Sequence, residues 1–169
     1  MIFNPDDIDA VAAQQDSVKQ AKREAATLAA NEHRQQIALA KQFVAEAAVH
    51  FYSWATRNGA PTNWTERPWE RRERKKGRRG WVIFEIIADL GGTDPRSDPT
   101  YAKIVVLDNG TPYYTRTHGV DDLLEIIRRG FASTQSSFSI AQSREVLEQG
   151  IKDKIAEFSR LAGIRFSAD

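Results

Sequence analysis

The apolar positions of the first sixty residues follow helical spacing, and no glycine or proline interrupts them between Pro5 and Asn58. Asn4 suits the N-cap position, because its side-chain oxygen can accept a hydrogen bond from the free amides of the first turn. Pro5 suits the first helical position, where a missing N–H costs nothing. Gly59 and Pro61 form a typical helix end. We therefore predict a helical stem over residues 1–60, in which the helix from Pro5 to Asn58 would be about 80 Å long if unbroken.

The two halves of this stem differ in how much apolar surface they carry. The second half, from Ile37 onward, has three-four spacing over a wide arc, so we expect it to pack on a globular domain. The first half is rich in Ala and Gln and has only a thin apolar stripe, so we expect it to project. Its candidate interface residues are Ile8, Val11, Val18 and Leu28. Such a stripe does not stabilise a helix in water unaided, which predicts self-association or docking on another protein. A loop that folds this half back into a hairpin is the simpler alternative.

Residues 61–80 form a connector with a different composition. Eight basic residues stand against three acidic ones, and Trp64, Trp69 and Trp81 bracket the charge. Clustered arginine and lysine neutralise phosphates, and an indole ring stacks on an unpaired base. The candidate contacts for nucleic acid or an acidic partner are Arg71, Arg72, Arg74, Lys75, Lys76, Arg78, Arg79 and Trp69. The alternative interpretation is a solvated loop whose tryptophans anchor it to the core, with arginines over indole faces.

Residues 81–169 show strand-like patterns first and helix-like patterns afterwards. Strands are predicted over Trp81–Asp89, Tyr101–Leu107 and Thr111–Thr117. The Asp108–Gly110 segment between the last two is typical of a hairpin turn. Pro112 lacks a donor for the ladder and so favours an edge position for the third strand.

Two helices complete this region. The first is predicted over Val120–Arg129, ending at Gly130, and the second from Ser139 to about Ala162, ending at Gly163. Ser139 and Gln142 have the spacing of a capping box. The sequence therefore predicts an α+β fold, in which a long N-terminal helix precedes a small antiparallel three-stranded sheet packed with two C-terminal helices. This small domain would cover residues 81–169.

Composition narrows the class of protein. The chain has 169 residues, of which 41% are hydrophobic and 28% charged, which is typical of a soluble globular protein. Its longest apolar run is too short to cross a membrane, and its first ten residues lack the basic segment of a signal peptide. We therefore expect no membrane partner and a cytoplasmic location, or a place in the virion if the chain is a phage component. No cysteine is present, so thiolate and disulfide chemistry are excluded.

The remaining candidates for catalysis are few. His33 and His50 would share one helix, but their 17-residue separation rotates them away from a common face. The Tyr113–His118 segment mixes enzyme-like side chains, but strand alternation would put Tyr113 and Thr115 on one face and Tyr114 and Arg116 on the other. No nucleophile elbow or phosphate-binding loop is present. We expect no catalytic residue, no metal ligand and no cofactor.

Two functions remain after these exclusions. The leading hypothesis is a non-enzymatic structural or adaptor protein that assembles through its N-terminal helix into a homo-oligomer or a larger complex, such as a scaffold or a virion. The alternative is a nucleic-acid-binding accessory protein that uses the basic 67–79 segment. Net charge alone does not separate them, because the total of +1 conceals the strongly basic connector.

Overall fold

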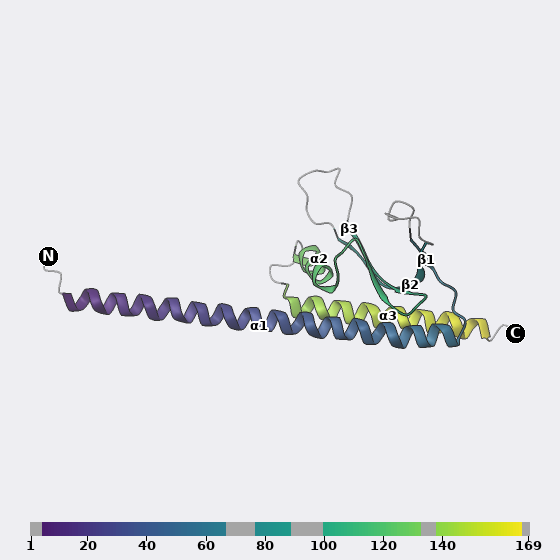
Figure 1. Ribbon diagram of the computed structural model, residues 1–169, viewed down its shortest axis with the longest axis horizontal. Coiled ribbons are helices and arrows are strands. Elements are labelled where there is room, and N and C mark those ends of the chain that lie inside the picture. The colour runs from purple at the N-terminus through teal and green to yellow at the C-terminus, as the bar shows by residue number, and fades with distance from the viewer. Residues whose placement is uncertain (1–4, 67–76, 89–99, 133–137, 167–169) are drawn as a thin grey trace. The chain divides into compact units, whose positions relative to one another are not determined.

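The computed structural model describes residues 5–66, 77–88, 100–132 and 138–166, which divide into two compact units, Met1–Gln35 and Gln36–Asp169. Figure 1 shows the elements along the chain and labels most of them. They are α1 (Pro5–Arg57), β1 (Trp64–Thr65), β2 (Arg79–Ala88), β3 (Thr100–Leu107), β4 (Pro112–Thr115), α2 (Val120–Ala132) and α3 (Ile140–Phe166). The first unit contains the beginning of α1, and the second contains residues 36–57 of α1 with all the other elements. The mixed α+β class and the long N-terminal helix are confirmed.

The sheet has four antiparallel strands in the order β1-β2-β3-β4, so the predicted count of three is wrong. The missed strand is β1, which pairs Trp64 with Gly80 and Thr65 with Arg79. Two residues are too few to show an alternating pattern, and their pairing partner lies farther along the chain. Both β1 and the first residues of β2 belong to the stretch that we interpreted as a connector. The three strands that were predicted are all present.

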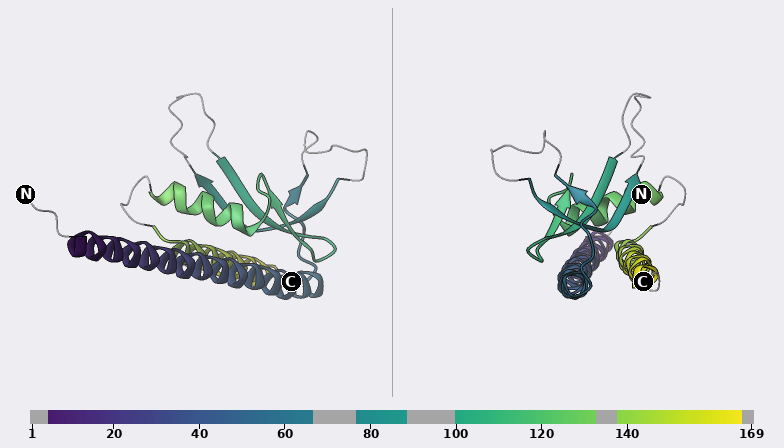
Figure 2. Two further views of the ribbon diagram at one scale, coloured as in Figure 1. Left: turned by 60° about the vertical axis from the view of Figure 1, so that its left-hand side comes forward. Right: turned by 90° about the vertical axis from the view of Figure 1, so that its right-hand side faces the viewer.

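Helices α2 and α3 and residues 36–57 of α1 all lie on one face of this sheet (Figure 2). Between them and the sheet is one main hydrophobic core. Its largest fully buried side chains include Phe51, Ile83, Ile104, Leu123, Leu124, Ile127, Leu147 and Ile151. The second half of the predicted stem therefore packs on the globular unit, as its wide apolar arc indicated.

Local signals are confirmed at the end of α1 and at the start of α3. The predicted end of α2 at Gly130 is wrong, because α2 continues to Ala132. At the end of α1, Gly59 has a φ of 59°, and the Ala60 N–H donates to the carbonyl of Ala55 at 2.9 Å, which is a Schellman-type end. At the start of α3, the Ser139 N–H donates to Gln142 Oε1 and the Gln142 N–H donates to Ser139 Oγ. The predicted end of this helix at Ala162 is wrong, because α3 continues to Phe166. A glycine inside a helix costs about 1 kcal/mol but does not terminate it.

The β3–β4 hairpin forms at the predicted turn, and β4 is an edge strand. Gly110 has a φ of 85°, and its N–H donates to the carbonyl of Leu107 at 2.8 Å. Strand β4 is shorter than predicted, since it ends at Thr115 rather than Thr117. Arg116 follows with a φ of 57°, a left-handed conformation that interrupts the extended backbone.

Candidate functional site

The first unit offers a helical surface made of residues 9–35 of α1. Every one of these residues is exposed. Among the predicted interface residues, the exposed fractions are 53% for Val11, 47% for Val18 and 64% for Leu28. Ile8 also lies in α1, but its side chain is outside the described part of the chain. Local contacts such as the 3.4 Å ion pair between Lys19 and Asp16 contribute only a few tenths of a kcal/mol to such a helix.

The second unit has a sheet face on which none of its described helices packs (Figure 2). We define this open face by the strand residues that alternate with those of the main core. They are Trp64, Val82, Glu85, Ile87, Tyr101, Lys103, Val105, Leu107, Tyr113 and Thr115. Val82, Val105 and Leu107 form a small second cluster, which Trp64 and Tyr113 partly cover. At the other end of the face, Ile87 and Tyr101 are exposed.

Two arginine–tyrosine pairs occur on the open face. The Arg78 guanidinium carbon lies 4.9 Å from the centroid of the Tyr113 ring, which also contacts Trp64 at a centroid distance of 5.6 Å. The Arg116 guanidinium carbon lies 5.9 Å from the centroid of the Tyr101 ring. Both distances are within the range of cation–π attraction. The face therefore combines aromatic rings with cations that are held over them.

A further charge pair lies between these two pairs. Lys103 Nζ is 3.1 Å from a carboxylate oxygen of Glu85, which stands directly opposite it on β2. The cations named on the open face are therefore Lys103, Arg78 and Arg116, and the anion named there is Glu85. The charged groups named here thus sum to a positive charge, which favours a negatively charged ligand.

The predicted nucleic-acid contacts are described only in part. Arg78 and Arg79 are exposed, at the start of β2. The other predicted contacts lie outside the described residues: Trp69, Arg71, Arg72, Arg74, Lys75 and Lys76. What the sequence reasoning missed is Tyr101, although its position two residues before Lys103 on a strand is a signal that could have identified it.

The segment from Tyr113 to Arg116 departs from the predicted alternation at one residue. Tyr113 contacts the small cluster on the open face, whereas Tyr114 packs against the main core, as predicted. Arg116 was expected beside Tyr114, and this expectation is wrong, because its guanidinium lies over Tyr101 on the open face. The physical reason is the positive φ of Arg116, which ends the two-residue repeat.

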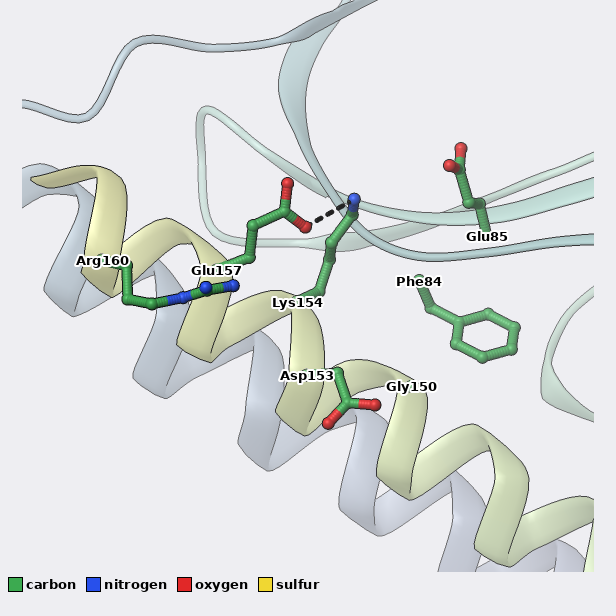
Figure 3. A pocket seen from close by; sticks show the side chains of 7 residues that line it. All are labelled: Phe84, Glu85, Gly150, Asp153, Lys154, Glu157 and Arg160. Atoms are coloured by element: carbon green, nitrogen blue, oxygen red, sulfur yellow. Dashed lines mark hydrogen bonds and ion pairs between the residues drawn. The ribbon is translucent and has the colours of Figure 1, made fainter.

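A pocket of about 350 Å³ lies between β2 and α3, and Figure 3 shows the side chains around it. Phe84 and Glu85 line it from the sheet, and Gly150 and charged residues line it from the helix. Lys154 and Glu157 form an ion pair at 2.9 Å, and Asp153 accepts a hydrogen bond from Gln149. These groups satisfy one another along one helix face, which is typical of a surface groove.

Titratable groups with displaced pKa values lie near α2. Burial, reinforced by the charge of Asp121, raises the pKa of Tyr114 to about 12. Hydrogen bonds from Arg128 and then Arg129 lower the pKa of Glu125 to about 2, although burial opposes them. Packing explains the raised pKa of Tyr114, and a surface ion-pair cluster explains the lowered pKa of Glu125. Neither group faces the pocket between β2 and α3.

All three histidines are exposed, with His33 and His50 on α1 and His118 just before α2. Within the ranges that the structure describes, no group of three His, Cys, Asp or Glu side chains could hold a metal ion. In the same ranges, no helix combines the length and the apolar character needed to span a bilayer.

Comparison with known proteins gave no significant match to a family model, to a curated protein or to a solved structure.

Proposed function

We propose that this chain is a non-enzymatic structural or adaptor protein that assembles through residues 9–35 of α1 into a homo-oligomer or a larger complex. The observation that supports the proposal is the exposure of all 27 residues of this helical segment, the apolar Val11, Val18 and Leu28 included. A helix without tertiary contacts is only marginally stable in water, so packing against a partner would stabilise it.

The sequence of the exposed segment suits helix pairing. Val11 and Val18 are separated by seven residues and therefore lie on nearly the same face, and Ala25 continues the repeat. Burying these side chains against a second helix removes apolar surface from water at about 25 cal/mol per Å². Assembly as a scaffold or within a virion would supply such a helix, as would a partner protein in the cytoplasm.

The experiment is a mass measurement by light scattering on the full chain and on two matched double variants. Val11→Lys/Val18→Lys places two charges in the apolar stripe. Ala13→Lys/Gln20→Lys adds the same charge with the same spacing to the opposite face of the helix. We expect the full chain to have a multiple of 19.1 kDa, the first variant to be monomeric and the second to keep its mass. A monomeric full chain would contradict self-assembly and leave docking on a different protein.

We propose nucleic-acid binding through the basic 67–79 segment as the alternative function. The observation that favours it is the placement of the exposed Arg78 over Tyr113, which puts a cation and an aromatic ring together at one end of this segment. Cations that contact phosphates release counterions, so the affinity would fall steeply with salt.

The test of this alternative is binding to a labelled oligonucleotide at several salt concentrations. A variant with glutamine at Arg71, Arg72, Arg74, Lys75 and Lys76 should bind at least tenfold more weakly and show a shallower dependence on salt. Lys152→Gln, which removes a charge from an exposed position of α3, is the control and should bind normally. Absence of binding by the unmodified chain at low salt would rule this function out.

A further inference from the structure

The open face of the sheet places its two arginine–tyrosine pairs at a spacing suited to a chain-like ligand. Tyr113 stands opposite Val105, four residues along β3 from Tyr101. With a rise of about 3.3 Å per residue and strands about 4.8 Å apart, the two tyrosines are about 14 Å apart. The ion pair of Glu85 and Lys103 lies between them. A ligand that contacts both pairs must therefore extend mainly along β3, over the open face of the sheet.

The Arg116–Tyr101 pair is formed at a cost to the backbone. Arg116 has a φ of 57°, and among the described residues it is the one non-glycine residue with a positive φ. Side chains rarely adopt this left-handed conformation because Cβ crowds the neighbouring carbonyl oxygen. At this position the conformation turns the arginine away from the face of Tyr114 and places it over Tyr101. Strain that positions one exposed side chain is typical of functional sites.

The chemistry of these groups fits single-stranded nucleic acid. Tyrosine rings and guanidinium groups both stack on bases, and guanidinium groups also donate hydrogen bonds to phosphate oxygens. Tyr101 is 40% exposed, so part of its surface is open to a base. In a duplex the base faces are already stacked on one another, which favours a strand whose bases are free.

We propose that Tyr101, held beneath Arg116, is a base-stacking site for single-stranded DNA or RNA, and that the strand crosses the open face toward Tyr113 and Arg78. Lys103 lies along this path as a further cation. The inference rests on the alternative function, nucleic-acid binding through the 67–79 segment. It adds that the ligand is single-stranded and that it makes a second contact at Tyr101.

The test measures binding of a labelled single-stranded oligothymidylate, and of a duplex of equal length, by fluorescence anisotropy at low salt. Tyr101→Ala removes the ring and should weaken single-strand binding about 5- to 100-fold. Tyr101→Phe keeps the ring and should bind within about twofold of the unmodified chain. Arg116→Gly removes the guanidinium and relieves the backbone strain, so its loss of affinity would not reflect unfolding. Lys152→Gln is the control on α3 and should bind normally.

Photocrosslinking to a strand that contains 5-iodouracil gives an independent reading. The crosslinked peptide should contain Tyr101. If Tyr101→Ala binds normally while the glutamine variant of the 67–79 segment does not, the stacking site is wrong and the alternative function stands. If the unmodified chain binds no oligonucleotide, both are wrong. Equal affinity for the duplex and the single strand would also overturn the proposed ligand class.

Discussion

A Cβ atom added to Gly150 would lie 2.6 Å from Cε2 of the Phe84 ring. The close packing of α3 against β2 at this point therefore requires a residue without a side chain. Phe84 is only 5% exposed and belongs to the main core, so moving its ring away disturbs the packing of that core. We expect Gly150→Ala to lower the free energy of unfolding by about 1–3 kcal/mol, because overpacking exceeds the gain in helix propensity of about 1 kcal/mol. Urea unfolding measures this change.

The control for this prediction is a double-mutant cycle. In a Phe84→Ala background both ring atoms that meet the new methyl group, Cε2 at 2.6 Å and Cδ2 at 2.7 Å, are removed, so Gly150→Ala should cost less than it does in the unmodified chain. Equal costs in the two backgrounds would show that the contact with Phe84 is not the cause.

The capping box at the start of α3 gives a second prediction. Ser139 and Gln142 satisfy each other's backbone N–H groups, at 2.7 Å to the Gln142 side chain and 3.2 Å to the Ser139 hydroxyl. Ser139→Ala leaves one of these donors without its acceptor and should cost about 1 kcal/mol. For a chain of this size the melting temperature should fall by about 2–4 °C. Gln142→Glu keeps an acceptor at the same place, so a similar fall in that variant would contradict the explanation.

Tyr114 gives a prediction at alkaline pH. Its pKa is raised from 10.0 to about 12, first by burial and second by the charge of Asp121. A raised pKa means that the stabilisation is complete below pH 10 and is lost as the pH rises from 10 through about 12. A spectrophotometric titration should therefore show one tyrosine that ionises late, and Tyr114→Phe should remove this late component. Asp121→Asn should shift it only slightly, since the charge of Asp121 is the smaller cause.

Much of the fold could be predicted because its signals are local. The end of α1 at Gly59 and the capping box of α3 depend on residues within one helical turn, which the sequence displays directly. Strand β1 could not be predicted, because its two residues become a strand only through pairing with Gly80 and Arg79. A pattern window has no information about such a distant partner.

For the candidate sites too, features that depend on local sequence could be predicted and features that depend on the folded backbone could not. The exposure of Val11 and Val18 agrees with the thin apolar stripe, because a stripe of this width lacks the area for a core. The position of Arg116 was predicted on the wrong face, since alternation assumes that the backbone stays extended. One residue with a φ of 57° breaks this assumption, and no local composition signal marks it, because Arg116 is neither glycine nor asparagine.

Glu125 gives the last prediction, at acid pH. Its carboxylate accepts two hydrogen bonds from Arg128, at 2.8 and 2.6 Å, and one from Arg129 at 2.8 Å, which lower its pKa from 4.5 to about 2. A lowered pKa means that the stabilisation is present above pH 4.5 and is lost as the pH falls through about 2. The side chain is 36% exposed, so solvent screening limits the effect to under about 1 kcal/mol.

The difference in unfolding free energy between the unmodified chain and Glu125→Gln should therefore be constant near neutral pH and shrink below pH 4.5. Glu145→Gln, at an exposed position of α3, is the control. A difference for Glu125→Gln that persists unchanged to pH 2 would show that the arginine pairs do not stabilise the fold.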